Sequence, residues 1–303
     1  MLSFKVKFFK EILKPFLKGF YMKKILPVLF AAAIFSSCDI VEAPYKEGVD
    51  TPIDTTQKYV QKVLIEDYTG FYCGNCPRAA NQAKELYDLY KNRVVIMGVH
   101  VGFFAKPKPN KNDYDFRTEV GTALDNFFGL ESAGLPQGMI SRIGYPTKTQ
   151  ATPDPAWGTK VQEVLAKEPV LGISLKPEFN KATKTLTLEA ITEFLKAAEP
   201  DAYLAVYLVE DSIIARQTDY SKTPSEIPDF VHMHVLRGAV NSTWGDQLST
   251  APIAAGAKFT KNYTYTIPAG KDWKPEHMKI IAFVHRYGST YEVLNAEEVD
   301  LIK

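Results

Sequence analysis

The chain has 303 residues, of which 46% are hydrophobic, and carries 36 basic against 35 acidic side chains. This hydrophobic content is enough for a sizeable buried core, and a chain of this length most often forms two domains. The nearly balanced charge gives no indication of nucleic-acid binding.

The first element of the chain is an export signal. Lys23 and Lys24 lead into an apolar run at residues 25–35, and small residues then precede Cys38. The run is shorter than the roughly 20 residues that span a bilayer, so we expect a signal peptide and not a retained membrane helix. Small residues directly before a cysteine resemble a bacterial lipoprotein signal, which implies that Cys38 carries a lipid. A plain secretory signal that leaves Cys38 unmodified is the alternative.

Cleavage before Cys38 divides the chain into a leader with its signal peptide, residues 1–37, and a mature protein. The leader contains seven lysines and one glutamate, so the mature protein has 29 basic and 34 acidic residues. Residues 38–57 are polar and contain prolines, as in a flexible tether. We therefore expect a protein that its N-terminal lipid holds at a membrane of the cell envelope, without a nucleic-acid partner.

Strands and helices alternate between residues 58 and 168. The pattern predicts strands at residues 59–68, 93–101 and 137–143, and helices at residues 77–90, up to 128 and 157–167. The middle strand is apolar along its whole core, which is typical of a strand that is buried on both faces. The sequence therefore predicts an α/β domain with a partly parallel sheet.

Cys73 and Cys76 lie between the first predicted strand and the first predicted helix. A thiol at the first turn of a helix faces unpaired backbone N–H groups and the positive end of the helix dipole, which favour its thiolate. We therefore expect the Cys73 thiolate to attack a disulfide of another protein and Cys76 to resolve the mixed disulfide that forms. In an exported protein such a pair is either a redox couple or a structural disulfide, and the ring it closes is too small to constrain the unfolded chain much.

The rest of the chain, residues 169–303, changes character. Seven segments alternate apolar and polar residues between turn-forming ones, and together they predict an antiparallel β-sandwich domain. They are residues 170–179, 185–194, 202–210, 231–238, 259–267, 278–286 and 291–302.

Metal binding is the weaker interpretation of the cysteine and histidine residues. His232 and His234 alternate on a predicted strand, but no third ligand has a suitable spacing. His100 ends a buried strand at the edge expected for the cysteine pair, and a structural role suits it better than a catalytic one. We expect neither a metal nor a cofactor.

The first domain resembles the thioredoxin-like superfamily. The resemblance depends on the Cys73-Gly74-Asn75-Cys76 motif at a helix start and on Pro136 directly before a later strand. It implies that Pro136 is a cis-proline that aligns an extended substrate, and that Asp67 is a buried acid that helps to deprotonate Cys76. A solvent-facing aspartate at a strand end is the alternative for Asp67.

The chain after Cys38 is also similar to the outer membrane protein 28-related lipoproteins of the Bacteroides group of bacteria. The similarity depends on residues 66–70 (EDYTG), 232–237 (HMHVLR), 244–245 (WG) and 292–296 (EVLNA). Members of that family are lipoproteins with a thioredoxin-like domain and a β-sandwich, and their substrates are poorly defined. The resemblance implies a location at the outer membrane, on its periplasmic side or at the cell surface, more than a mechanism.

Two functions are consistent with this sequence. The first is thiol-disulfide exchange, in which the Cys73 thiolate attacks a disulfide of an exported protein and Cys76 resolves the mixed disulfide. This function also needs an electron donor or acceptor. The second is a surface lipoprotein whose β-sandwich binds a peptide, a glycan or an envelope partner, with a purely structural cysteine pair.

Overall fold

The computed structural model of the chain describes residues 58–109, 111, 113–147 and 149–302. The predicted leader, signal peptide, lipidated Cys38 and tether lie outside these residues. The part that is described contains no helix both long and apolar enough to cross a membrane. Its helices are α3 (Cys76–Tyr90), α4 (Gly102–Ala105), α5 (Glu119–Phe128) and α6 (Trp157–Leu165).

The strands alternate with these helices at first and then follow one another directly. They are β1 (Val63–Thr69), β2 (Val94–His100), β3 (Gln137–Ile140), β4 (Leu171–Asn180), β5 (Thr185–Phe194), β6 (Ala202–Glu210), β7 (Ile213–Thr218), β8 (Glu226–His232), β9 (Val235–Ala239), β10 (Asp246–Gln247), β11 (Lys258–Thr266), β12 (Met278–Arg286) and β13 (Val293–Asp300). The chain is therefore a mixed α/β protein that is rich in antiparallel strands.

One large sheet unites the two halves of the described chain. Its strands lie in the order β13-β12-β6-β9-β2-β1-β3, and β10 pairs with β6. β2 is parallel to β1 and to β9, which it meets at Gly98 and Val235, while β3 is antiparallel to β1. Because β9 comes from the predicted second domain, this sheet crosses the boundary that the sequence places at residue 168.

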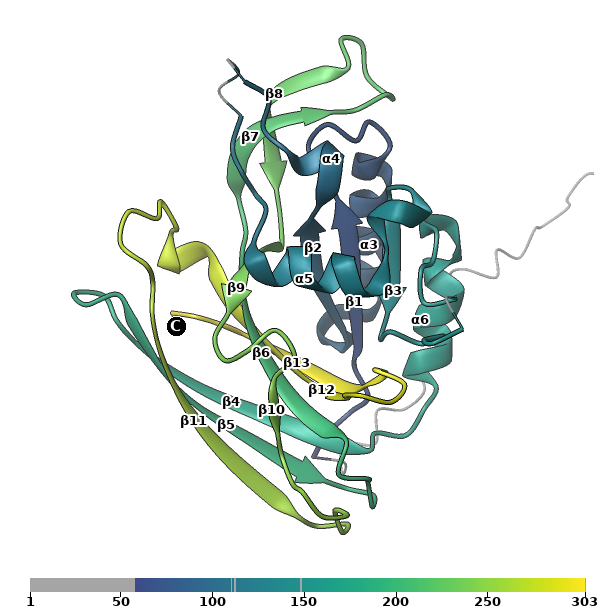
Figure 1. Cartoon of the computed structure of the whole chain (residues 1–303), viewed down its shortest axis with the longest axis vertical. Coiled ribbons are helices and arrows are strands. Elements are labelled where there is room, and N and C mark those ends of the chain that lie inside the picture. Colours follow the sequence, from purple (N-terminus) through teal and green to yellow (C-terminus); the bar gives the residue numbers. More distant parts are fainter. Residues whose placement is uncertain (1–57, 110, 112, 148, 303) are drawn as a thin grey trace, which may run out of the picture. The chain divides into compact units, whose positions relative to one another are not determined.

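Helices cover both faces of the central strands. α3 and α6 pack on the face that carries Val63 and Ile96, and α5 packs on the opposite face with Leu64 and Val95. Figure 1 shows α5 in front of β1 and β2, with α3 behind them. Burial on both sides explains why β2 is apolar at almost every position, whereas β1 is apolar at Val63–Ile65 and then carries the buried acids Glu66 and Asp67.

A second layer packs against the far half of the large sheet. β4, β5 and β11 form an antiparallel sheet of their own, visible at the lower left of Figure 1. Alternate residues of β6 and β12 point toward this layer, and the residues between them point toward the core under α5. β6 and β12 are therefore buried on both faces, which explains their continuous apolar sequence.

Apart from the short additional strand β10, the structure differs from the predicted strands around residues 213–239. Residues 231–238, predicted as one strand, are divided between β8 and β9, and the break falls at His234, whose φ is +56°. β7, which has no counterpart among the predicted strands, pairs with β8 to form a hairpin outside the large sheet. The sequence pattern missed this hairpin because its residues are mostly half-exposed and show no clear alternation.

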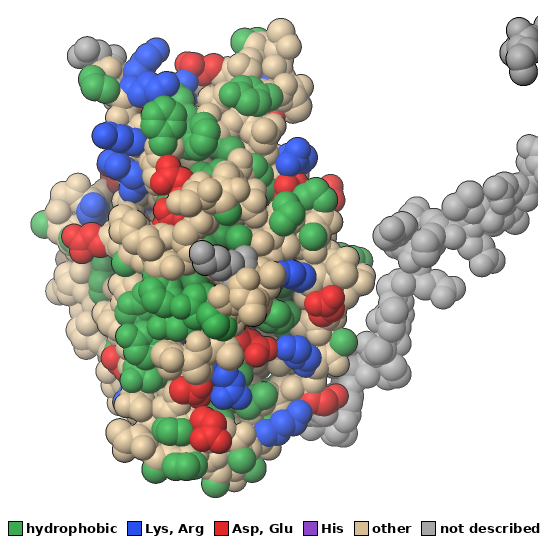
Figure 2. Space-filling view, turned by 45° about the vertical axis from the view of Figure 1, so that its right-hand side comes forward, with side chains coloured by type: hydrophobic (Ala, Val, Ile, Leu, Met, Phe, Trp, Pro, Cys, Tyr) green, Lys and Arg blue, Asp and Glu red, His purple; other side chains and the backbone are tan. Residues whose placement is uncertain are grey.

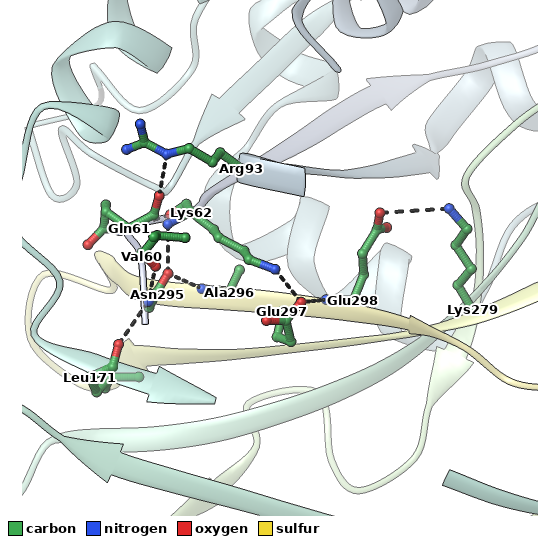
Figure 3. Close-up of polar contacts among 10 residues, drawn as sticks. All are labelled: Val60, Gln61, Lys62, Arg93, Leu171, Lys279, Asn295, Ala296, Glu297 and Glu298. Atoms are coloured by element: carbon green, nitrogen blue, oxygen red, sulfur yellow. Dashed lines mark hydrogen bonds and ion pairs between the residues drawn. The ribbon is translucent and has the colours of Figure 1, made fainter. Parts of the chain in front are cut away.

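Asn295 joins three segments that are distant in the sequence, as Figure 3 shows. Its side-chain amide donates to the carbonyl oxygens of Val60, at 3.1 Å, and Leu171, at 2.8 Å, and its oxygen accepts from the backbone N–H of Lys62, at 2.9 Å. Asn295 is only 2% exposed. The side chain therefore connects β13 to the segment before β1 and to the start of β4.

Candidate functional site

Cys73 and Cys76 are joined by a disulfide, with their Cα atoms 5.4 Å apart. β1 leads into the loop that carries Cys73, and Cys76 is the first residue of α3. Cys73 is 4% exposed and Cys76 is 1% exposed. The two residues therefore have the predicted position between strand and helix, but little of either is open to solvent.

The hairpin of β7 and β8 covers the disulfide. The backbone N–H of Thr218 donates to Phe71 O at 2.8 Å, and that of Tyr220 donates to Gly74 O at 2.9 Å. The amide nitrogen of Gln217 donates to Cys73 O at 3.0 Å. A Cβ atom at Gly74 would lie 2.4 Å from the Tyr220 ring, so the close approach of the hairpin requires glycine there.

Arg216 of β7 adds a polar connection between the hairpin and the residue before Cys73. Its guanidinium donates to Tyr72 Oη at 2.8 Å and lies over the Tyr72 ring at 4.5 Å. Tyr72 in turn donates to Asp113 at 2.6 Å, and Arg216 pairs with the same carboxylate. The hairpin is thus attached to both sides of the loop that carries Cys73.

Pro136 follows Leu135 through a cis peptide bond and immediately precedes β3. β3 is antiparallel to β1, and Gln137 pairs with Tyr68 near the end of β1. Pro136 therefore lies at the end of the sheet from which the chain continues into the cysteine loop.

Asp67 is buried on the face of β1 that α3 covers. It is 5% exposed, and burial, with a smaller effect of the Asp154 charge, raises the pKa of its carboxyl to about 7. Asp67 and Cys76 line the same cavity, which contains about 540 Å³. The structure thus places Asp67 inside the protein and not at the solvent-facing position of the alternative interpretation.

His100 lies at the end of β2 on the same face. Its ring stacks on Phe116 at 4.5 Å and lies 5.6 Å from His232. Burial holds the pKa of His100 well below its usual value and lowers the pKa of His232 to about 4, so both rings are neutral at physiological pH. Within the described ranges, no group of three His, Cys, Asp or Glu side chains is arranged to hold a metal ion.

A buried ion pair supports the opposite face of β1. Arg142 donates two hydrogen bonds to Glu66, at 2.8 and 2.9 Å, and both side chains are fully buried. No local sequence pattern indicates this pair, because 76 residues separate its members and only the fold brings them together. Its position below the sheet indicates a structural role.

Six aromatic side chains form an extended cluster at one end of α5. Neighbouring rings have centroids 4.9 to 6.0 Å apart, and Phe127 is 41% exposed. On the face of the molecule drawn in Figure 2, hydrophobic side chains gather in a broad patch near the middle. The members of this aromatic cluster are Phe127, Phe128, Tyr145, Trp244, Tyr287 and Tyr291.

The structure therefore brings together several of the predicted site residues. Cys73, Cys76 and Asp67 lie near the end of β1 and the start of α3, with Pro136 at the same end of the sheet. Cys38 lies outside the described residues. The covering hairpin could have been suspected only from the turn-forming residues 219–225 between its strands.

Comparison with known proteins gives one family and one shared fold. The family model described as "Outer membrane protein Omp28" matches residues 122–302. The solved structure of HBP35 of Porphyromonas gingivalis is similar with a TM-score of 0.59 and 19% sequence identity, over 80% of this chain and 76% of that one. At this identity the similarity indicates a shared fold alone.

Two further solved structures are less similar. A protein from Agrobacterium tumefaciens has a TM-score of 0.48 and 11% identity, over 82% of this chain and 97% of that one. A domain of the outer membrane lipoprotein Omp28 from Porphyromonas gingivalis has a TM-score of 0.30 and 23% identity, over 44% of this chain and 89% of that one. No curated protein matches the sequence.

Proposed function

We propose, from the premise that this chain belongs to the Omp28 family of outer membrane proteins, that it is an envelope lipoprotein that binds another envelope component. The matched region covers more than half of the chain. This membership confirms the predicted location in the cell envelope, at the outer membrane. Lipid attachment at Cys38 stays a prediction of the sequence.

The burial of the disulfide is the observation that carries this proposal. A thiol-disulfide oxidoreductase needs an attacking sulfur that a protein substrate can reach. Here Cys73 is 4% exposed, and the β7–β8 hairpin donates hydrogen bonds to the backbone carbonyl oxygens of Cys73 and Gly74. A disulfide in that position is better suited to fixing the loop between β1 and α3 than to exchange.

The aromatic cluster is the surface that we propose for binding. Aromatic side chains are enriched at protein interfaces. Of the six rings Phe127 is exposed, three are half-buried and two are buried, so a partner would reach the cluster through Phe127 and the half-buried rings. A peptide, a glycan or an envelope protein would each pack against such rings. The predicted β-sandwich contributes Trp244, Tyr287 and Tyr291 to it, which supports the view that this half of the chain binds the partner.

Thiol-disulfide exchange is the second candidate, and specific geometry favours it. We propose that residues 58–168 have a thioredoxin-like arrangement and that residues 169–303 form a sandwich that shares its sheet. Support comes from the cysteine pair at the start of α3, from cis-Pro136 before β3 and from the buried carboxyl of Asp67. In this function the hairpin must open before an exported protein reaches Cys73.

The reduction potential of the disulfide tests the two candidates. We expect a potential below about −300 mV, which is typical of structural disulfides. A higher potential, together with mixed disulfides that accumulate on Cys73 in a Cys76→Ser variant, would replace binding by exchange as the function.

The binding surface has a separate test in cells. A photo-crosslinking amino acid at position 127 should capture an envelope component, whereas the same amino acid at position 103 should not. Phe103 is the matched control because it is 70% exposed and lies outside the aromatic cluster. Equal capture at both positions would argue against this surface.

A further inference from the structure

The cavity beside Asp67 is suited to a small ligand. It holds about 540 Å³, within the range of roughly 300–1,000 Å³ that is usual for ligand pockets. Its walls come from α3 on one side and, on the other, from residues 230–234, which are the end of β8 and the two residues that link it to β9. The space exists because the facing positions carry small residues, Ala80 and Ala83 on α3 and Gly98 on β2.

The inner end of this cavity is polar and carries hydrogen-bonding capacity that the protein does not use. Among the described residues, Asp67 Oδ1 and His100 Nδ1 are buried without a hydrogen-bond partner. Each of the two side chains is 5% exposed, and both line the cavity. A buried carboxylate without a hydrogen-bond partner costs free energy, so a ligand that donated a hydrogen bond to it would gain affinity.

The charged groups around the cavity indicate the sign of the charge that the ligand carries. His100 is neutral because burial depresses its pKa, so it places no positive charge near Asp67. The basic groups that line the cavity already have acidic partners: Lys84 pairs with Asp88, and Lys279 lies 3.9 Å from Asp211 and 3.7 Å from Glu298. In the part of the chain that is described, Asp67 has no basic side chain paired with it.

The remaining walls indicate the body of the ligand. Ile96, Phe230 and the methyl groups of Ala80 and Ala83 give the cavity apolar walls. Apolar walls with a few placed polar groups are typical of small-molecule sites. A charged group at the inner end therefore has to be carried by a hydrocarbon or aromatic body.

We propose that this cavity binds a small organic amine, whose protonated nitrogen pairs with the carboxylate of Asp67 and whose apolar body lies between α3 and the segment 230–234. An organic anion does not fit, because it would bring a second negative charge to Asp67. The proposal is independent of what the aromatic cluster binds and of whether the disulfide exchanges.

Two probes with the same body test the charge requirement. 2-Phenylethylamine and 2-phenylethanol differ only in the amino group and the hydroxyl group. Calorimetric titration of the full chain, with the disulfide closed and at pH 8, should show that the amine binds at least about tenfold more tightly than the alcohol. Equal affinities, or no binding of the amine at millimolar concentration, would overturn the proposal.

Variants locate the binding. Asp67→Asn should weaken the amine about tenfold or more and leave the alcohol unchanged, while Glu163→Gln, an exposed carboxyl on α6, should leave both unchanged. Ala80→Trp should abolish binding of both probes, because the exposed Ala80 lines the cavity and a large ring there would fill it. Amine affinity that survives Ala80→Trp would exclude this cavity, even if Asp67→Asn proved unable to fold.

Discussion

Substitution of Asp67 by asparagine should make the folded protein more stable at neutral and alkaline pH. The pKa of the Asp67 carboxyl is about 7 in the folded protein against an ordinary value of 3.8, and burial is the main cause. The folded state therefore holds a proton that the unfolded state releases. The contribution of Asp67 to stability is therefore largest below about pH 4 and is lost as the pH rises from about 4 to about 7, because over that interval this group binds more protons in the folded state than in the unfolded state.

The difference in pKa fixes the size of the effect. Each unit is worth about 1.4 kcal/mol, so ionised Asp67 should cost the folded protein about 4 kcal/mol above pH 7. An asparagine at this position has no charge to bury and no titration. The gain in unfolding free energy of Asp67→Asn over the parent should therefore be about 4 kcal/mol larger at pH 8 than at pH 4.

Urea denaturation of both proteins at the two pH values measures this double difference. Other titrating groups are common to both proteins and cancel. Asp229→Asn is the matched control, because it makes the same substitution at an exposed carboxyl on β8 and leaves Asp67 in place. Parallel pH profiles for the parent and Asp67→Asn would refute the reasoning, since they would mean that Asp67 titrates alike in the folded and unfolded states.

Three further substitutions test the other contacts. Asn295→Leu should lower the unfolding free energy by about 3–5 kcal/mol, because it leaves the backbone groups of Val60, Lys62 and Leu171, buried or partly buried, without their partner. A loss below about 1 kcal/mol in urea denaturation would contradict this. Arg142→Met should lower the unfolding free energy by about 3–5 kcal/mol, because it leaves the Glu66 carboxylate unpaired in the core. Adding Glu66→Leu should restore most of that stability. A double variant as unstable as the single one would show that packing and not charge is responsible. Tyr220→Ala should speed reduction of the disulfide by dithiothreitol about tenfold, which corresponds to lowering the free energy of hairpin opening by about 1.4 kcal/mol. Unchanged reduction kinetics would mean that the hairpin does not protect the sulfurs.

The sequence by itself determined the local elements that the cysteine pair depends on. The strand before Cys73 and the helix after it lie within a few residues of their predicted ends, because apolar periodicity and the Cys76-Pro77 helix start are properties of neighbouring residues. Most of the later strands also match their predicted residues, because each face of a strand that packs on another layer carries apolar side chains, and these are visible in the sequence. The envelope location followed from the signal and from the family resemblance.

Only the tertiary structure decided how these elements combine. The pairing of β2 with β9 joins Gly98 to Val235, and no local pattern records which of several apolar strands will become neighbours. The cover over Cys73 depends on backbone hydrogen bonds from a half-exposed hairpin, which carries no strong hydrophobic signal of its own. The predicted electrostatics of the helix start were local, whereas the accessibility of the sulfur is set by a segment about 145 residues further along the chain, and that is a property of long-range packing alone.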